Sequence, residues 1–347
     1  MIAQLLCPLV APGGCPLRSK RRGGNLFRLA KPEGAYQIEL EDVSVPDITS
    51  TEVLIRTERT LISRGSEIWR RYVREEAIDP AIMGYSLVGS IAQVGSRVPE
   101  FSMGDRVAAV APHAEWVAVE VVNPKVIPSV VSLPGDVSSE AGTFWPLGTS
   151  STMWMDELDP GDQETVVIMG QGLVGSGCLQ ALKAKSKARV TAVDAIPARC
   201  DLALTLGADA TIDVSKEDPV EAIKEATEGE GADYVVYAVG GRSGARAFEQ
   251  AQDMVRRGGL IQVIGLYEDE KLPLDSGKIQ GKRILGGFVD MSKRPQASDR
   301  SIQLIAEGKI NVEAMITHRF NFKQAAEAYD MLYSRLHECM AVILEWK

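Results

Sequence analysis

The stretch TVVIMGQGLVG, Thr165–Gly175, decides the fold of this 347-residue chain. It begins with a short apolar run, continues with the glycine pattern GxGxxG and leads into residues with helical spacing. The next apolar run, RVTAV, is followed by Asp194, 24 positions after Gly170. A strand, a glycine turn, a helix and a carboxylate after the next strand together predict a dinucleotide-binding unit.

The three glycines of this turn have separate physical roles. Gly170 permits the tight turn, Gly172 lets the backbone approach a pyrophosphate, and Gly175 lets the helix pack closely against the strand. Leu173 and Val174 open the helix, so their N–H groups are expected to face the phosphates. The alternative is an ordinary connection between a strand and a helix.

The acidic residue after the second strand predicts which dinucleotide binds. Asp194 can accept hydrogen bonds from the adenosine ribose, and its negative charge would repel a 2′-phosphate. We therefore expect NAD, with NADP less favoured. Arg199 could soften that preference, but an arginine on a helix face is expected to be simply solvated.

Strands and helices alternate through residues 149–289, which predicts a doubly wound parallel α/β sheet, that is, a Rossmann domain that binds NAD. Small or apolar residues at the ends of its later strands are expected to touch a cofactor that lies across the carboxyl edge of the sheet. Packing within the sheet is the alternative reason for them. These residues are Ala238, Val239, Gly240, Gly265, Gly287 and Phe288.

The earlier part of the chain has a different rhythm. Residues 25–148 contain short runs rich in Val, Ile and Thr with Gly or Pro between them, which predicts a compact and mostly β domain with one helix at residues 66–76. The helices and final strand of residues 290–347 are expected to complete this first domain. Residues 1–24 place an apolar piece before a basic cluster, the reverse of a secretory signal, so we expect a flexible extension outside the fold.

Composition narrows the class of protein. A formal charge of −9 argues against a nucleic-acid surface, and the absence of a long apolar run argues against a membrane span. Five scattered cysteines without a CxxC pair favour a reducing cytoplasm over a disulfide framework. We expect a cytoplasmic protein whose partner is a small-molecule substrate.

The stretch GYSLVGSIAQVGSRVPEFSMGDRV, residues 84–107, together with the glycine turn, resembles the medium-chain dehydrogenase/reductase superfamily in its zinc-type alcohol dehydrogenase branch. The resemblance extends from about Asn25 to the C-terminus. It implies an α/β protein with a GroES-like, β-rich catalytic domain and a Rossmann domain. It also implies a homodimer or homotetramer paired through the strand RILGGFV, residues 283–289.

The resemblance also shows where this chain departs from the zinc branch. By motif, Arg64, Tyr85 and Leu147 stand at the three positions of the catalytic zinc ligands. Arginine cannot deprotonate to bind a cation and leucine has no donor atom, so we expect no metal. The run of four cysteines that binds structural zinc in that family is missing as well.

Without a metal, a hydrogen-bond donor has to act on the substrate oxygen. Tyr85 is the best candidate, and Arg64 could lower the pKa of its phenol; alternatively, Tyr85 only fills the vacated volume. Ser66 matches the relay hydroxyl of the family, or it caps the following helix. Trp69 occupies the position of the relay histidine, and Glu67 keeps a carboxylate where the family has Asp.

Three further side chains are expected to have mainly structural roles. Trp69 and Trp145 could line a substrate pocket, although core packing is the default for tryptophan. His113, in the stretch PHAEW, is expected to be structural.

These features lead to one preferred function and two alternatives. We expect a zinc-independent, NAD-dependent oxidoreductase that interconverts an alcohol and a carbonyl by hydride transfer. An NAD(P)H-dependent quinone or enoyl reductase is the first alternative, although Gly170 and Asp194 count against it. A catalytically silent NAD-binding protein is the second.

Overall fold

The structure is a computed structural model that describes residues 26–266, 271–288 and 290–347. The predicted extension of residues 1–24 lies outside the described residues. The described part of the chain forms two compact units. The first contains the residues up to Thr143, with His318–Ser334 and Val342–Lys347, and the second contains Phe144–Thr317 and Arg335–Ala341.

The second unit is built on a parallel sheet of six strands, which confirms the predicted doubly wound fold. The strand order is β10-β9-β8-β11-β12-β13. Strands β9 and β10 follow on one side of β8, and β11 to β13 follow on the other, so the order of the strands reverses between β8 and β11. Ligands of such sheets bind at that reversal, outside the carboxyl ends of the strands. The strands are β8 Thr165–Met169, β9 Arg189–Asp194, β10 Ala210–Asp213, β11 Ala232–Tyr237, β12 Val255–Val263 and β13 Arg283–Gly286.

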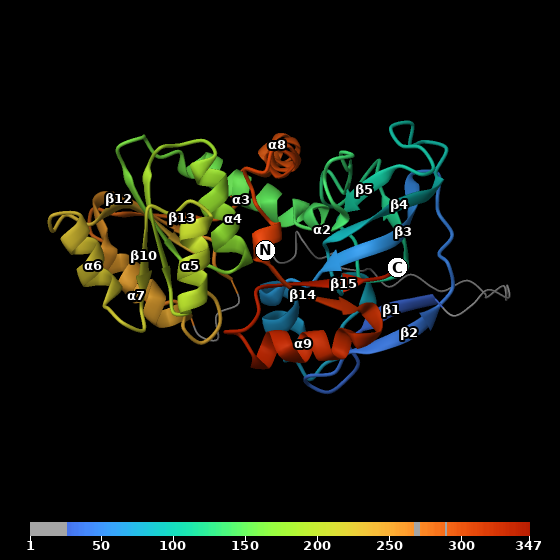
Figure 1. Cartoon of the computed structure of the whole chain (residues 1–347), viewed down its shortest axis with the longest axis horizontal. Helices are drawn as coiled ribbons and strands as arrows, with labels where there is room; N and C mark the ends of the chain where they lie inside the picture. Colours follow the sequence, from blue (N-terminus) through green and yellow to red (C-terminus); the bar gives the residue numbers. More distant parts are fainter. Residues whose placement is uncertain (1–25, 267–270, 289) are drawn as a thin grey trace. The chain divides into compact units, whose positions relative to one another are not determined.

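Helices cover both faces of this sheet, with α6 and α7 on one side and α3 and α4 on the other (Figure 1). Val167 and Met169 of β8 belong to the same buried cluster as Ile223 of α6 and Phe248 of α7. Residues 166–169 of β8 are all apolar and buried, and because successive strand residues point to opposite faces, the strand needs cover on both sides. The helices are α3 Trp145–Leu158, α4 Leu173–Lys183, α5 Pro197–Thr205, α6 Pro219–Ala226, α7 Gly244–Met254 and α8 Arg294–Ala306.

The chain after residue 290 is divided differently from the prediction, which gave all of residues 290–347 to the first domain. Helix α8 stays with the second unit because it packs along α3. Trp145 of α3 is fully buried and donates from Nε1 to Ser298 Oγ of α8 at 2.9 Å. The boundary between the units falls at Phe144, a few residues before the predicted residue 149.

Helix α3 was not predicted because its sequence, WPLGTSSTMWMDEL, has no polar face. Twelve of its fourteen residues are buried, so the usual apolar stripe is absent. Two of its four hydroxyl groups turn back onto the helix: Thr149 Oγ1 donates to the Trp145 carbonyl at 2.8 Å and Ser150 Oγ to the Pro146 carbonyl at 3.2 Å. Those bonds let hydroxyl side chains lie inside the unit.

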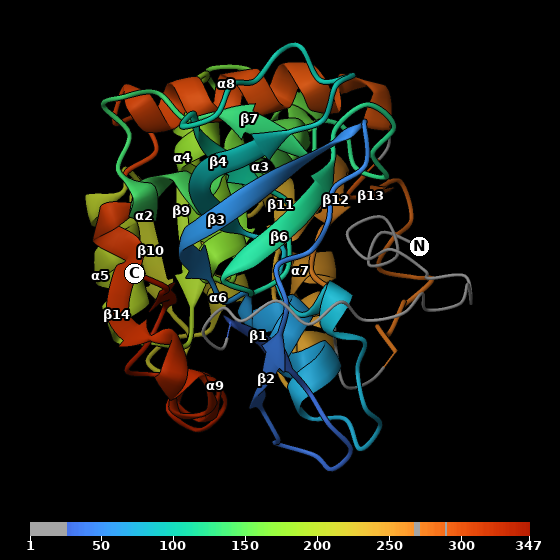
Figure 2. The same cartoon turned by 90° about the vertical axis from the view of Figure 1, so that its right-hand side faces the viewer.

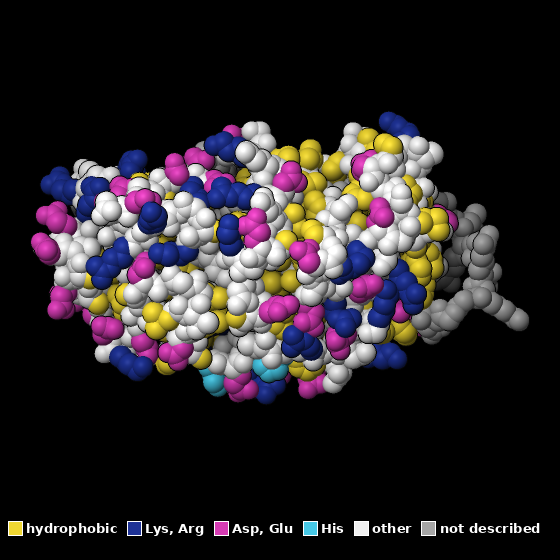
Figure 3. Space-filling view, turned by 45° about the horizontal axis from the view of Figure 1, so that its top comes forward, with side chains coloured by type: hydrophobic (Ala, Val, Ile, Leu, Met, Phe, Trp, Pro, Cys, Tyr) yellow, Lys and Arg dark blue, Asp and Glu magenta, His cyan; other side chains and the backbone are white. Residues whose placement is uncertain are grey.

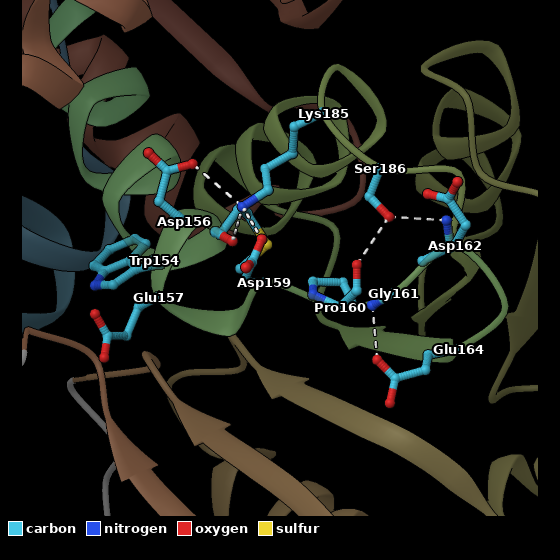
Figure 4. A network of polar contacts seen from close by, with 12 residues as sticks. Trp154, Asp156, Glu157, Asp159, Pro160, Gly161, Asp162, Glu164, Lys185 and Ser186 are labelled. Atoms are coloured by element: carbon cyan, nitrogen blue, oxygen red, sulfur yellow. Dashed lines mark hydrogen bonds and ion pairs between the residues drawn. The ribbon is translucent and has the colours of Figure 1, made fainter.

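Hydrogen bonds and an ion pair connect the segment after α3 with the segment after α4, close to where β8 begins (Figure 4). Lys185 Nζ lies 2.9 Å from Asp159 Oδ1 and donates to the Met155 carbonyl at 3.1 Å. Ser186 Oγ donates to the Pro160 carbonyl at 3.2 Å. These contacts fix the connection that leads from α3 into β8.

The first unit is built on an antiparallel sheet in which β3 pairs with both β4 and β6 (Figure 2). The C-terminal strand β15 pairs with the end of β3, so the last residues of the chain return to this sheet as predicted. The strands are β1 Leu26–Ala30, β2 Glu39–Val43, β3 Glu52–Leu61, β4 Leu87–Val94, β5 Arg106–Ala109, β6 Trp116–Glu120, β7 Val130–Ser132, β14 Ile316–Asn321 and β15 Ala341–Glu345.

Short helices complete the first unit. The helix predicted at residues 66–76 exists as η1, Arg64–Tyr72, and packs against α9, Ala325–Ser334. The other short elements are η2 Pro80–Ile82, α2 Ser139–Gly142 and η5 Phe322–Gln324 here, and η3 Met291–Lys293 and η4 Glu313–Met315 in the second unit. No helix among the described residues is both long and apolar enough to cross a membrane.

Candidate active site

The glycine turn leaves β8 and enters α4 as the sequence predicts. Gly170 has φ +87°, in the left-handed region that favours glycine, and its N–H donates to the Val193 carbonyl at 2.8 Å. A Cβ on Gly175 would overlap the Gly170 carbonyl oxygen. Gly172 is the N-cap of α4, and no side chain caps that helix end. The first turn of α4, with Leu173 and Val174, therefore keeps N–H groups available for an anion.

Asp194 is held against this turn. Its Oδ2 accepts from the Gln171 N–H at 2.7 Å and its Oδ1 from the Ile196 N–H at 2.9 Å. Both bonds come from backbone groups, so the carboxylate is fixed in one orientation at the end of β9. A fixed carboxylate is what recognition of a ribose diol requires.

The prediction that Arg199 is simply solvated is wrong. Its side chain is only 13% exposed, and Nη1 lies 3.9 Å from Asp194 Oδ2. Its Nη2 donates to the carbonyls of Leu336 and Cys339, at 3.4 Å each. The same guanidinium is the nearest neighbour that a Cβ on Gly172 would meet, at 4.0 Å. A positive charge therefore lies beside both the glycine turn and Asp194.

The residues predicted from the later strands lie along the same edge. The Ala238 N–H donates to the Met169 carbonyl at 2.9 Å, and Val239 and Gly240 follow directly. A Cβ on Gly265 would overlap the Val239 carbonyl oxygen, so close packing is a sufficient reason for that glycine.

Gly287 and Phe288 follow β13 and face α3. A Cβ on Gly287 would meet Trp154 Nε1 at 3.0 Å, and the rings of Phe288 and Trp154 lie 4.9 Å apart. Packing thus accounts for Gly287 as it does for Gly265.

Tyr85 of the first unit is buried, with a partner that the sequence did not indicate. Its hydroxyl donates to Ser63 Oγ at 2.7 Å. Ser63 is the N-cap residue of η1, and Ser66 is the third residue of that helix, so the reading of Ser66 as the cap is wrong. Ser66 is also buried.

Arg64 and Trp69, both in η1, form a stacked pair. The Arg64 guanidinium lies 5.6 Å from the centre of the Trp69 ring, and its Nε donates to the Leu332 carbonyl of α9 at 3.1 Å. The Trp69 ring also meets Tyr333 of α9 edge to face at 5.9 Å. Trp145 forms part of the core of the second unit, so its reading as a pocket residue is wrong.

Helix η1 also carries a fully buried carboxylate, Glu67, which shares the partner Ser63 with Tyr85. Its Oε1 accepts from the Ser63 N–H at 2.8 Å. Its Oε2 lies 2.9 Å from His113 Nε2 and also accepts from the Tyr329 hydroxyl. The interpretation of His113 as a structural residue therefore gains a definite contact: its partner is Glu67, 46 positions away in the sequence.

Charges around Glu67 keep it ionised. Burial raises its pKa, but nearby His113, the hydrogen bond from His113, nearby Arg71 and the hydrogen bond from Tyr329 together lower it below its usual value. Burial and the adjacent carboxylate raise the pKa of Tyr329 well above its usual value, so that phenol stays protonated and donates. Since the acceptor is a carboxylate, His113 Nε2 carries a proton and donates as well.

The three positions implied for zinc ligands do not offer a donor set. Arg64 and Tyr85 use their polar groups as hydrogen-bond donors to Leu332 and Ser63, and Leu147 is a buried apolar residue of α3 in the second unit. Among the described residues, no group of three or more His, Cys, Asp and Glu is arranged to hold a metal ion. The residues present do not fit a catalytic zinc.

Two family models match this chain. The model of the alcohol dehydrogenase GroES-like domain matches residues 49–126, and the model of zinc-binding dehydrogenases matches residues 174–307. The first match falls on the antiparallel sheet with Tyr85, and the second begins inside the glycine turn.

Whole-length relatives agree with these models. The chain is 27% identical to the sorbitol dehydrogenase of Bacillus subtilis strain 168, over 92% of this chain and 97% of that protein. It is 27% identical to the D-arabitol-phosphate dehydrogenase of Enterococcus avium, over 86% and 91%. An alcohol dehydrogenase of Escherichia coli CFT073, solved with NADH, has the same fold, with a TM-score of 0.79 at 20% identity over 93% of this chain and all of that one.

Proposed function

The chain belongs to the medium-chain dehydrogenase/reductase superfamily, and we propose that it interconverts an alcohol and a carbonyl with NAD and without zinc. It is an oxidoreductase that acts on alcohols or carbonyls and uses a nicotinamide dinucleotide. The proposal concerns three finer points: the preference for NAD, the independence of zinc and the roles of the side chains.

The arrangement around Asp194 supports NAD. Its carboxylate is fixed by two backbone N–H groups beside the glycine turn. A 2′-phosphate placed against it would bring two negative charges together. Arg199 offsets part of that repulsion, so we propose that NADP is used more weakly rather than refused.

Tyr85 supports chemistry without a metal. In the oxidation direction the nicotinamide accepts the hydride, and a protein group has to accept the hydroxyl proton. In the reduction direction a protein group has to donate a proton to the carbonyl oxygen. We propose that Tyr85 performs both transfers: as a phenolate it accepts the hydroxyl proton, and as a phenol it donates a proton to the carbonyl oxygen. We propose that its hydrogen bond to Ser63 orients the phenol, and that Ser66 and Arg64 help to hold the substrate.

The observation that carries the proposal is the chemistry of residues 64, 85 and 147, which are a guanidinium, a phenol and a leucine side chain. The corresponding experiment assays the purified enzyme with sorbitol, D-arabitol phosphate and a series of secondary alcohols, before and after dialysis against a strong zinc chelator. We expect unchanged turnover and a zinc content far below one ion per chain. Loss of turnover that added Zn²⁺ restores would overturn the zinc-independent mechanism.

Asp194→Asn should change cofactor choice. The amide keeps one acceptor oxygen near the turn but removes the charge, so a charged hydrogen bond worth about 1.5–3 kcal/mol is weakened. We expect the ratio of kcat/KM for NAD to that for NADP to fall about 10- to 100-fold. The measurement is steady-state kinetics with each cofactor at saturating alcohol.

Asp194→Ala is the companion variant. It removes the acceptor for the Gln171 N–H as well, so it should weaken NAD further while relaxing the same discrimination. An unaltered cofactor ratio in both variants would show that the ribose contact lies elsewhere.

We also propose a homodimer or homotetramer and a cytoplasmic, small-molecule role without nucleic acid or membrane partners. Strand β13 lies at the edge of the six-stranded sheet, with Ile284 42% exposed, which supports pairing of two copies there. Acidic and basic side chains are interspersed on the face in Figure 3, which supports a small-molecule role rather than phosphate-backbone binding.

A further inference from the structure

The buried network of the first unit connects Tyr85 to a residue that the proposed chemistry has not used. Tyr85 donates to the Ser63 hydroxyl at 2.7 Å, and the backbone N–H of the same serine donates to Glu67 Oε1 at 2.8 Å. Ser63 is therefore held from one side by the carboxylate while it holds the phenol on the other. The position of the phenol oxygen depends on Glu67 through a single intervening residue.

A second route reaches Tyr85 from the backbone of its own turn. The His113 N–H donates to the Met83 carbonyl at 2.7 Å. Gly84 has φ +101°, and a Cβ there would meet the His113 ring at 2.7 Å, so the imidazole lies directly against the turn. His113 also donates to Glu67 Oε2 at 2.9 Å. The two routes thus meet at the Glu67 carboxylate.

From this geometry we propose that the Glu67–His113 pair is a positioning device for Tyr85. Glu67 fixes Ser63, His113 fixes the turn Met83–Gly84, and their mutual hydrogen bond fixes one relative to the other. This inference rests on the proposed role of Tyr85 and names two residues that act through it without touching the substrate.

The free-energy cost of burying the Glu67–His113 pair indicates that the pair serves to position Tyr85 rather than to stabilise the fold. The side chains of Glu67 and His113 are both 0% exposed. Taking an ionised group out of water costs several kcal/mol, which its partners have to offset. A well-packed apolar pair in the same place would often be at least as stable. A catalytic group displaced by about 1 Å loses on the order of 100-fold in rate, which gives a reason for a rigid ionised support.

A direct test observes Tyr85 without any substrate. The protein has eight tyrosines, so labelling them with ¹³C at Cζ gives few NMR signals, and Tyr85→Phe identifies the signal of Tyr85. We expect Glu67→Gln and His113→Leu to move or broaden that signal. Ser129→Ala is the control, because it removes a 2.6 Å hydrogen bond to the Glu120 carbonyl elsewhere in the same unit and should leave the signal in place. An unmoved Tyr85 signal in both Glu67→Gln and His113→Leu would overturn the inference.

A kinetic test separates positioning from simple stabilisation. We expect Glu67→Gln to lower kcat for the best of the assayed alcohols about 10- to 100-fold, with the Kd of NAD unchanged. His113→Gln, which can keep an N–H donor, should recover part of the kcat lost in His113→Leu.

The decisive comparison is the double variant Glu67→Gln with Tyr85→Phe. If Glu67 acts through Tyr85, this variant should be no slower than Tyr85→Phe alone, whereas independent effects would multiply. Multiplied losses would overturn the positioning role and leave the function of Tyr85 intact. Full activity in Tyr85→Phe alone would instead refute the proposed catalytic role of Tyr85, and the NMR comparison would still decide whether the pair holds the phenol.

Discussion

Tyr85→Phe should lower kcat for alcohol oxidation about 100-fold or more, the size of effect that a positioned general acid or base has. Phenylalanine keeps the ring and loses only the hydroxyl, which donates to Ser63 at 2.7 Å. The ring volume of a buried residue is then preserved, so the fold should be retained. The glycine turn and Asp194 belong to the other unit, so the Kd of NAD should not change. Steady-state kinetics and a fluorescence titration with NADH measure the two quantities.

Tyr36→Phe is the matched control for this prediction. It removes the same atom from the same residue type in the first unit, where the Tyr36 hydroxyl lies 3.0 Å from that of Tyr333. Its kcat should stay close to that of the unaltered enzyme. If Tyr85→Phe keeps the kcat of the unaltered enzyme as this control does, the phenol only fills volume and another group transfers the proton.

The nucleotide half of the site could be predicted from the sequence because its determinants are local. The turn from Gly170 to Gly175 joins adjacent elements. Gly170 has a positive φ, and Gly175 leaves no room for a Cβ beside the Gly170 carbonyl, so both glycines are required by nearby backbone. Asp194 follows from the strand pattern alone. In the structure β9 pairs with β8, which brings the end of β9 beside this turn.

The other half could not be predicted because its partners are far apart in the sequence. Glu67 meets His113 from 46 positions away and Tyr329 from 262 positions away. The sequence indicated a carboxylate at 67 and a lone histidine at 113, but no periodicity or spacing pairs such residues. Ser63 was missed for a related reason, since the resemblance drew attention to Ser66 three positions later.

A common theme links the departures from the zinc branch. The resemblance places Arg64 and Tyr85 at two positions of zinc ligands, yet a guanidinium cannot bind a cation and the Tyr85 hydroxyl donates to Ser63. In this chain the segments that carry them are joined instead by Glu67 and His113, through Ser63 on one side and Met83 on the other. We interpret the buried pair as the support that keeps this part of the site rigid.

Gly175→Ala should damage both the fold and cofactor binding. The new Cβ would overlap the Gly170 carbonyl oxygen, and its next neighbour, the Gly170 carbonyl carbon at 2.9 Å, is also backbone that cannot rotate away. Helix α4 would have to move away from β8, at a cost of about 3 kcal/mol or more for overpacking a buried contact. We expect a lower Tm without NAD and no measurable NAD binding.

Gly172→Ala, three residues earlier, separates the two effects. A Cβ there would meet only the Arg199 guanidinium, at 4.0 Å, and its φ of −80° suits alanine, so Tm without NAD should be unchanged. The same methyl group would stand where the backbone approaches the pyrophosphate. Affinity for NAD should therefore fall about tenfold, the equivalent of about 1.4 kcal/mol or one net hydrogen bond. Calorimetric titration with NAD and thermal unfolding without it provide the comparison. Equal loss of stability in the two variants would contradict the assignment of Gly175 to helix packing and Gly172 to the cofactor.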